Sequence, residues 1–277
     1  MRSWYADRAE TYPWRRPSPE PYEVLVSEVM LQQTQAARVA PAYVEFVLGF
    51  PTVAALAAAS KADVVRAWGR LGYPRRAVAL HAAARTVMRE HDGRIPSDVE
   101  TLLTLPGVGP YTASAVASIA YGRRVAAVDT NVRRVVARFT LGSEPAQMRS
   151  DDVAAAALAW LDVDDPGAWN QALMDLGREV CRPAPRCEGC PVSVDCRFLS
   201  LGAKPRPSGR RRPRFEGSIR QTRGLILEHL RGRRSMPEAS VANVVGEQAA
   251  SAPAAVEGLV RDGIVERIRG GRIRLAV

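Results

Sequence analysis

The stretch Leu105-Pro-Gly-Val-Gly-Pro-Tyr-Thr112 decides the fold of this chain. Gly107 and Gly109 allow left-handed backbone angles and close approach of another group, and Pro110 suits the first turn of a helix. The unpaired backbone amides at such a helix start form a ready anion site. The stretch therefore predicts a turn between two helices that grips a phosphate. An ordinary helix–helix connection is the alternative on these residues alone.

Two carboxylates, one on each side of this turn in the sequence, are candidates for a functional role. Downstream, a helix is predicted over 111–121, a short extended run over 125–128 and a helix over 130–139, so Asp129 directly precedes a helix. Its default role there is an N-cap, which is compatible with catalysis. Upstream, Glu28 lies among apolar residues at helical spacing. A solvent-facing helix edge is the ordinary alternative for Glu28.

Most of the chain has the pattern of short helices. Beyond a short helix over 2–10, helices are predicted over 36–47, 52–58, 61–70, 74–91, 150–161 and 167–180, with breaks or caps such as Ser60 or Ser97 between them. No segment alternates as a strand before residue 260. The expected fold class is therefore mainly α.

The C-terminal part has its own pattern. Residues 201–216 are rich in Pro and Arg and predict a linker, and 217–277 predict three helices at 218–231, 237–247 and 251–262 followed by a hairpin around Gly270-Gly271. This order resembles a winged helix, whose wing would carry Arg267, Arg269, Arg272 and Arg274 toward DNA. A packing or protein-binding module is the alternative for this small domain.

Charge and composition favour a polyanionic partner. The chain has 277 residues, 47% of them hydrophobic, a formal net charge of +10 and a pI near 10.1. Nucleic acid is the first candidate, although the near-exclusive use of arginine over lysine also fits GC-rich coding. Because no apolar run of signal-peptide or membrane-spanning length is present, we expect a cytoplasmic protein with no membrane partner.

All four cysteines fall in one short segment. They read Cys181-x5-Cys187-x2-Cys190-x5-Cys196. In a reducing compartment such crowding predicts a metal or cluster site rather than disulfides. Four thiolates suit a tetrahedral zinc or a 4Fe-4S cluster. Zinc ribbons usually pair two Cys-x2-Cys knuckles and this segment has one, which favours the cluster and leaves zinc as the alternative.

At this point the chain resembles a known family. The segment Val26-Ser-Glu-Val-Met-Leu-Gln-Gln-Thr-Gln35, then Leu71-Gly-Tyr73, the turn at 105–112, Val128-Asp-Thr-Asn-Val132 and the cysteine segment occur in the order found in MutY-type adenine DNA glycosylases. These enzymes belong to the helix-hairpin-helix superfamily that includes endonuclease III. The resemblance covers residues 1–200.

The resemblance implies a domain organisation and partners. We expect a six-helix barrel over 19–122, with its hairpin at 105–112, and an iron–sulfur cluster domain made from 1–18 and 123–200. It also implies a monomer that binds double-stranded DNA with a mispaired or damaged base, in a bacterial cytoplasm and associated with the nucleoid.

The resemblance assigns chemistry to the two carboxylates. Cleavage of an adenine glycosidic bond needs a proton on the departing base and negative charge beside the developing sugar cation. Glu28 is similar to the family's general acid and Asp129 to its stabilising carboxylate. Burial between apolar helix positions would raise the pKa of Glu28 and keep a proton available near neutral pH.

One hairpin residue separates base removal from strand cleavage. Endonuclease III-type enzymes carry at the position of Tyr111 a lysine that attacks the sugar. Tyrosine forms no Schiff base, and Arg133 stands where some MutY-type enzymes have lysine. We therefore expect water as the nucleophile and little strand cleavage.

Further site residues follow from the resemblance alone. It implies that Gln33 and Tyr73 wedge into the duplex, that Asn131 helps to place the catalytic water, and that Gly107 and Gly109 grip the backbone. It also implies a base pocket formed by Trp14, Arg15 and Gln171. Thr34, Gly72 and Tyr73 would contribute to recognition of the damaged base. Packing is the ordinary alternative for each of these residues.

Three departures from the family pattern bear on function. The first cysteine gap is five residues where the family usually has six, and the segment after 200 is too short for the usual Nudix-like domain. Thr130 replaces the commonest glycine, as in mismatch glycosylases that remove thymine or uracil. The first hypothesis is thus removal of adenine opposite 8-oxoguanine or guanine. A thymine or uracil mismatch glycosylase and a non-catalytic iron–sulfur DNA-binding or redox-sensing protein are the alternatives.

Overall fold

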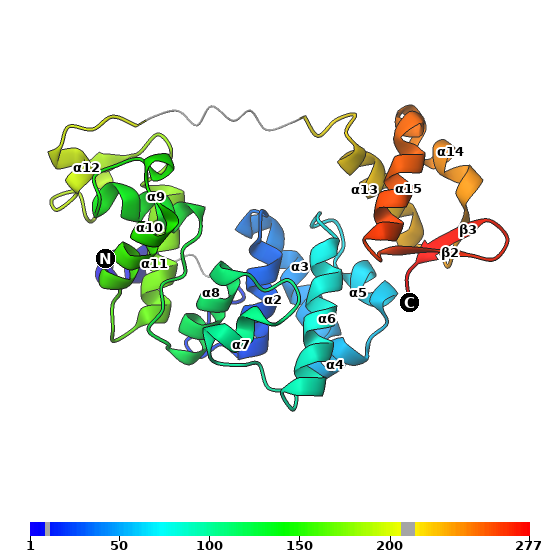
Figure 1. Ribbon diagram of the computed structural model, residues 1–277, viewed down its shortest axis with the longest axis horizontal. Helices are drawn as coiled ribbons and strands as arrows, with labels where there is room; N and C mark the ends of the chain where they lie inside the picture. The colour runs from blue at the N-terminus through cyan, green and yellow to red at the C-terminus, as the bar shows by residue number, and fades with distance from the viewer. Residues whose placement is uncertain (9–11, 206–213) are drawn as a thin grey trace. The chain divides into compact units, whose positions relative to one another are not determined.

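The protein is mainly helical, as predicted (Figure 1). The computed structural model describes residues 1–8, 12–205 and 214–277. The end of the predicted helix over 2–10 and much of the predicted linker over 201–216 lie outside the described residues. The chain divides into two compact units: 1–28, 95–104 and 108–210 form the first, and 29–94, 105–107 and 211–277 form the second. Within the described residues, no helix has the length and apolar character needed to cross a bilayer.

The first unit is a set of helices around an aliphatic core. Its helices are α1 (Arg2–Arg8), most of α2 (Pro21–Leu31), α7 (Val99–Leu103), α8 (Pro110–Tyr121), α9 (Thr130–Phe139), α10 (Ser150–Ala159), α11 (Pro166–Glu179) and α12 (Arg197–Ser200), with 3-10 turns η1 (Pro145–Gln147) and η2 (Cys187–Gly189). Val135, Val153 and Leu176 are buried in the core shared by α9, α10 and α11.

The second unit combines helices of two distant sequence regions. It holds the end of α2, α3 (Ala36–Gly49), α4 (Val53–Ala58), α5 (Lys61–Ala67), α6 (Arg75–Glu90), α13 (Ile219–Arg231), α14 (Val241–Val245) and α15 (Ala252–Arg261). The C-terminal region adds 3-10 turns η3 (Glu238–Ser240) and η4 (Gly246–Ser251) and strands β1 (Met236–Pro237), β2 (Val265–Ile268) and β3 (Arg272–Leu275).

Side-chain caps set several helix starts. Ser60 accepts from the amide of Asp63 at 3.1 Å and so begins α5, as predicted. Asp98, not Ser97, caps α7 by accepting from the amide of Thr101 at 2.8 Å. The Ser97 hydroxyl instead accepts from Arg123 at 2.7 Å. The sequence did not predict α7, because five residues are too few to show a helical period.

The C-terminal region has the predicted winged-helix form of three helices and a hairpin. Its antiparallel strands lie in the order β1-β3-β2, and Gly270 and Gly271 take positive φ angles of 78° and 63° in the turn. Two details differ from prediction. β1 is a strand before residue 260, which two residues could not reveal, and the helix expected over 237–247 is split into η3, α14 and η4 at Gly246, whose φ is 57°.

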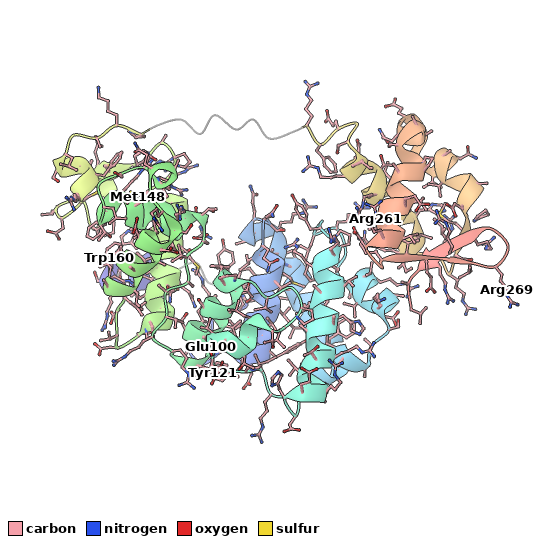
Figure 2. All side chains as sticks on the ribbon, viewed as in Figure 1. Glu100, Tyr121, Met148, Trp160, Arg261 and Arg269 are labelled. Carbon is pink, nitrogen blue, oxygen red and sulfur yellow. The ribbon has the colours of Figure 1, made fainter. Side chains whose placement is uncertain are left out.

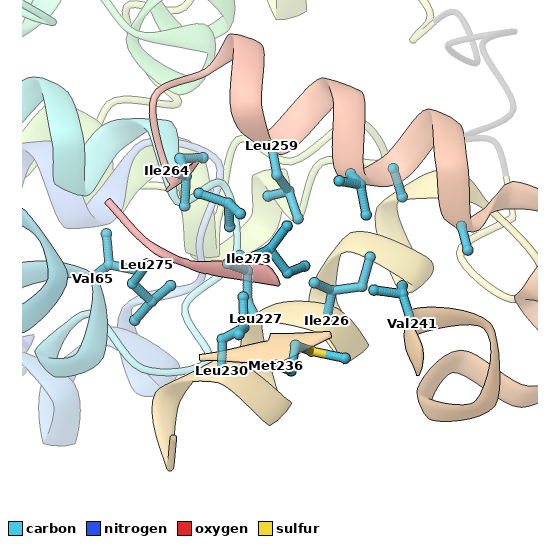
Figure 3. Packing of buried hydrophobic residues seen from close by; sticks show 14 of the residues in the cluster. Val65, Ile226, Leu227, Leu230, Met236, Val241, Leu259, Ile264, Ile273 and Leu275 are labelled. Carbon is cyan, nitrogen blue, oxygen red and sulfur yellow. The ribbon is translucent and has the colours of Figure 1, made fainter. Parts of the chain in front are cut away.

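The C-terminal region shares its core with α5. Figure 3 shows Val65 of α5 next to Leu275, within a buried cluster that also contains Ala62 and Ile264. Arg70 adds an ion pair with Glu228 at 2.6 Å. The apolar face of α5 is therefore covered by the C-terminal helices and sheet.

One glycine shapes the hairpin. Gly107 has φ 78°, and a Cβ there would lie 2.6 Å from the Cβ of Ala79 on α6. The site thus needs glycine for both backbone angle and close packing. Gly109 differs from prediction: its φ is −97° and nothing lies within 4 Å of a Cβ there. As the N-cap of α8 it needs an extended rather than a left-handed backbone, and its surroundings are open.

Candidate active site

Glu28 is a buried acid held by the hairpin helix. Its side chain lies on α2 with 4% of its surface exposed. Tyr111, in the first turn of α8, donates its hydroxyl to Oε2 of Glu28 at 2.7 Å. Burial raises the pKa of Glu28 to about 7, while the Tyr111 hydrogen bond opposes the shift and the charge of Asp129 adds to it. The carboxyl can therefore carry a proton near neutral pH.

Asp129 caps α9 and keeps one fixed orientation. Its Oδ1 accepts from the amides of Asn131 at 2.9 Å and Val132 at 2.7 Å, and its Oδ2 accepts from the Asn131 side chain at 3.0 Å. Burial raises the pKa of Asp129, and these donors oppose that shift. The N-cap predicted for Asp129 is thus confirmed.

Asn131 is itself held by a residue that sequence reasoning missed. Arg134 donates to Oδ1 of Asn131 at 2.9 Å, to the carbonyl of Gly177 at 2.6 Å and to the carbonyl of Cys181 at 2.6 Å. A Cβ at Gly177 would lie 2.7 Å from that of Asn131, so glycine lets α11 approach α9. No local motif marks Arg134 or Gly177, because their partners are distant in sequence.

The same unit contains a cavity of about 300 Å³. Tyr5, Arg15, Ile119, Gly167 and Gln171 are among the residues that line it. The Tyr5 hydroxyl donates to the side-chain oxygen of Gln171 at 2.7 Å. The predicted residues Arg15 and Gln171 therefore come together at one cavity, to which Tyr5 adds a residue without a sequence signal.

Arg15 and Trp14 have different surroundings. Arg15 makes a two-point ion pair with Asp175, at 2.7 and 2.9 Å, in which both side chains are mostly buried. Trp14 is 8% exposed and stacks on Tyr12, with ring centroids 4.9 Å apart. Trp14 is not among the residues that line the 300 Å³ cavity. Its local role is to pack the segment that carries Arg15.

Gln33 and Tyr73 share an unusual backbone conformation in the second unit. Their φ angles are 58° and 46°, in the left-handed region where non-glycine residues are uncommon. Each such residue costs about 1–3 kcal/mol and persists only where its surroundings impose it. Gln33 is exposed and Tyr73 is 45% exposed. Thr34 is half-buried, and its hydroxyl accepts from Arg76 at 2.9 Å.

The four cysteines face a common space. Cys181, Cys187, Cys190 and Cys196 line one small cavity with apolar side chains, and an Arg138 nitrogen lies 3.8 Å from the sulfur of Cys181. In the parts of the chain that the structure describes, no three His, Cys, Asp or Glu side chains are arranged to hold a metal ion. Four thiols around one apolar space fit the donor set of an iron–sulfur cluster.

Most wing arginines have protein partners. Arg267 pairs with Glu238 and Glu257, Arg274 pairs with Glu266, and Arg272 donates to Ser235. Arg269 is exposed at the turn between β2 and β3 (Figure 2). The pairing favours the alternative that this region is a packing module, since a DNA-binding wing would present unpaired cations.

The Arg133 guanidinium is hydrogen-bonded to residues 145–150. Its guanidinium donates to the carbonyls of Met148 at 2.5 Å and Pro145 at 3.1 Å and to the hydroxyl of Ser150 at 3.3 Å. These contacts fix the loop that follows α9.

Comparisons with known proteins show which fold this chain has. Residues 26–157 match the model of the HhH-GPD superfamily of base excision DNA repair proteins. A solved structure of a thermostable thymine-DNA glycosylase is 28% identical with a TM-score of 0.66, covering 72% of this chain and 93% of that one. A non-covalent endonuclease III–DNA complex, 23% identical with a TM-score of 0.61 and covering 72% and 92%, shares the fold. The fold is that of the helix-hairpin-helix DNA glycosylases.

Whole-chain relatives narrow this class. An adenine DNA glycosylase of Mycolicibacterium smegmatis is 45% identical over 100% of this chain and 94% of its own length. The human adenine DNA glycosylase is 43% identical over 71% of this chain and 38% of its own length. The chain belongs to the MutY-type adenine DNA glycosylase family. Residues 217–277 have the winged-helix-like form described above.

Proposed function

We propose that this enzyme removes adenine mispaired with 8-oxoguanine or guanine from double-stranded DNA, with Glu28 as the general acid. The buried carboxyl of Glu28, with a pKa near 7 and a hydrogen bond from Tyr111, is the observation that carries the proposal. The names of the whole-chain relatives support adenine as the base. The enzyme acts as a monomer.

The reaction follows from the two carboxyl groups. Glu28 gives its proton to a nitrogen of the adenine as the bond from the base to the sugar C1′ breaks, so the base leaves neutral. The sugar becomes cationic and Asp129 stabilises it electrostatically. A water oriented with the help of Asn131 then bonds to C1′, and the ionised Glu28 accepts the proton that this water loses. The products are free adenine and an abasic site.

Strand cleavage is not part of the proposed activity. The side chain that reaches Glu28 from the hairpin is Tyr111, which has no amine to attack the sugar. The guanidinium of Arg133 is hydrogen-bonded to the loop after α9. The enzyme should therefore leave an intact abasic strand until alkali is added.

The remaining predicted residues serve DNA distortion and base binding. Gln33 and Tyr73, exposed on strained turns, wedge into the duplex and offset the few kcal/mol of unstacking. Thr34 and Gly72 belong to the same turns. The cavity lined by Arg15 and Gln171 receives the flipped base, while Trp14 stacks on Tyr12 and packs the segment that carries Arg15. The backbone amides at the start of α8, with Gly107 setting the turn, hold a DNA phosphate.

The cysteine segment holds a 4Fe-4S cluster. Four thiols lining one apolar space support this assignment, and the cluster would join the segment after α11 into one folded loop. Purified protein should be brown and contain about four irons per chain, as expected for one cluster. Colourless protein with one zinc would instead identify the zinc alternative.

The main rival activity is removal of thymine or uracil. Thr130 and the likeness to a thymine-DNA glycosylase structure favour it. The test incubates the enzyme with duplexes that hold adenine opposite 8-oxoguanine, adenine opposite guanine, thymine opposite guanine, or uracil, followed by alkali. Breaks at adenine support the proposal, and breaks only at pyrimidines refute it. Binding without breaks in any duplex would indicate a non-catalytic DNA-binding protein.

A further inference from the structure

One buried arginine contacts both turns that carry the proposed wedge residues. Arg76 lies in the first turn of α6 with 9% of its surface exposed. Its Nη1 donates to the carbonyls of Val29, Met30 and Gln32, at 3.0, 2.8 and 2.5 Å. Its Nη2 donates to the Thr34 hydroxyl at 2.9 Å and to the carbonyls of Leu71 and Gly72 at 3.4 and 3.1 Å. The acceptors lie on both sides of Gln33 and directly before Tyr73.

The first set of acceptors lies at the C-terminal end of α2. The carbonyls of Val29 and Met30 belong to the last turn of a helix, where backbone oxygens lack partners within the helix. A cation is favourable there because the C-terminus carries partial negative charge. Arg76 therefore satisfies the end of α2 at the point where the chain turns into the left-handed residue Gln33.

The second set fixes the turn before α6. Gly72 has φ 77° and Tyr73 has φ 46°, so two left-handed residues follow each other. The Gly72 carbonyl accepts from both Arg76 and the indole of Trp68, the latter at 3.1 Å. The Arg76 guanidinium also lies 5.3 Å from the ring centroid of Trp68 and 5.4 Å from that of Tyr73. The Tyr73 ring is thus held by a cation–π contact as well.

We propose that Arg76 is a positioning residue that holds Gln33 and Tyr73 in their strained conformations, so that both meet DNA as one rigid unit. Its effect on base flipping rests on the wedge role proposed above; its effect on the two turns does not. Burial lowers the pKa of Arg76 to about 10, so the cation persists at neutral pH. Only a forked guanidinium can donate in both directions at once, and a lysine ammonium at this depth cannot replace it.

The first test needs no DNA. Hydrogen exchange is compared between the native enzyme, Arg76→Lys and the matched control Arg75→Lys, whose arginine is exposed and pairs with Asp262. In Arg76→Lys, amides of 32–35 and 71–73 should exchange faster together, while those of 130–139 are unchanged. Native exchange at both turns, or a uniform increase across the whole chain, would overturn the proposal.

The second test measures base flipping. 2-Aminopurine is placed at the target position in Glu28→Gln protein with and without Arg76→Lys, and its fluorescence reports unstacking. Arg76→Lys should reduce the flipped fraction at least about tenfold opposite 8-oxoguanine and less opposite an abasic site, where little unpairing is needed. An equal loss in both duplexes would overturn this role. No adenine removal by native protein, with the exchange result intact, would refute the proposed function and leave the turn assignment standing.

Discussion

At the scale of single residues, the protonation of Glu28 controls the proposed chemistry. Burial raises the pKa of its carboxyl to about 7, and the Tyr111 hydroxyl stabilises the ionised form. A general acid must be protonated before the reaction, so the rate of base removal should fall as pH rises through about 7.

Replacing Tyr111 by phenylalanine should move this pH dependence upward. The substitution removes a donor that favours the carboxylate, so the pKa of Glu28 rises further and the acid stays protonated to higher pH. Single-turnover rates of adenine removal between pH 6 and 9 measure the midpoint. A midpoint that moves to lower pH would contradict the assigned hydrogen bond.

Glu28 should also destabilise the folded protein at high pH. Because its pKa is raised from 4.5 in the unfolded chain to about 7 in the fold, its contribution is fully present below pH 4.5 and is lost as pH rises through 7. The Glu28→Gln variant lacks this pH-dependent loss. Its free energy of unfolding, relative to that of the native enzyme, should therefore be about 3 kcal/mol higher at pH 8 than at pH 4. Urea unfolding at the two pH values tests this, and a difference independent of pH would contradict it.

Sequence identified some of these residues and missed others for a physical reason. The apolar neighbours of Glu28 on one helix predicted its burial, and the position of Asp129 before a helix predicted its cap. Arg134 and Asp175 gave no signal, because each depends on a partner in another part of the chain. Long-range pairing is set by packing and leaves no local motif.

At the scale of elements, the hairpin depends on one glycine. Gly107→Ala should destabilise the protein by about 2–4 kcal/mol, from a left-handed backbone and an overlap with Ala79. Gly109→Ala is the matched control, since its backbone is extended and its surroundings are open. Thermal unfolding compares them. Equal stability of the two variants would contradict the packing at Gly107.

Element prediction succeeded where the pattern was long. Most helices longer than ten residues, such as α6 and α11, begin and end within a residue or two of their predicted limits because apolar periodicity and caps agree. α7 and β1 were missed, since five and two residues carry no period. The left-handed angles at Gln33 and Tyr73 were also invisible, because neither residue type favours them.

At the scale of the whole molecule, the C-terminal region is joined to α5 by a common core. Val65 is 1% exposed within that core. Val65→Ala should cost on the order of 2 kcal/mol in the full chain, and clearly less in a chain that ends at 216, where the residue faces solvent. Unfolding of the four proteins measures the coupling. An equal cost in both backgrounds would contradict the shared core.

The central claim is that Glu28 protonates the departing adenine. The most direct measurement is the single-turnover rate of adenine release from a duplex with 8-oxoguanine opposite, for the native enzyme and Glu28→Gln, together with DNA affinity. The account predicts unchanged binding and a rate reduced by about 10²–10⁴-fold, the usual contribution of a general acid. Release by Glu28→Gln at nearly the native rate would contradict it.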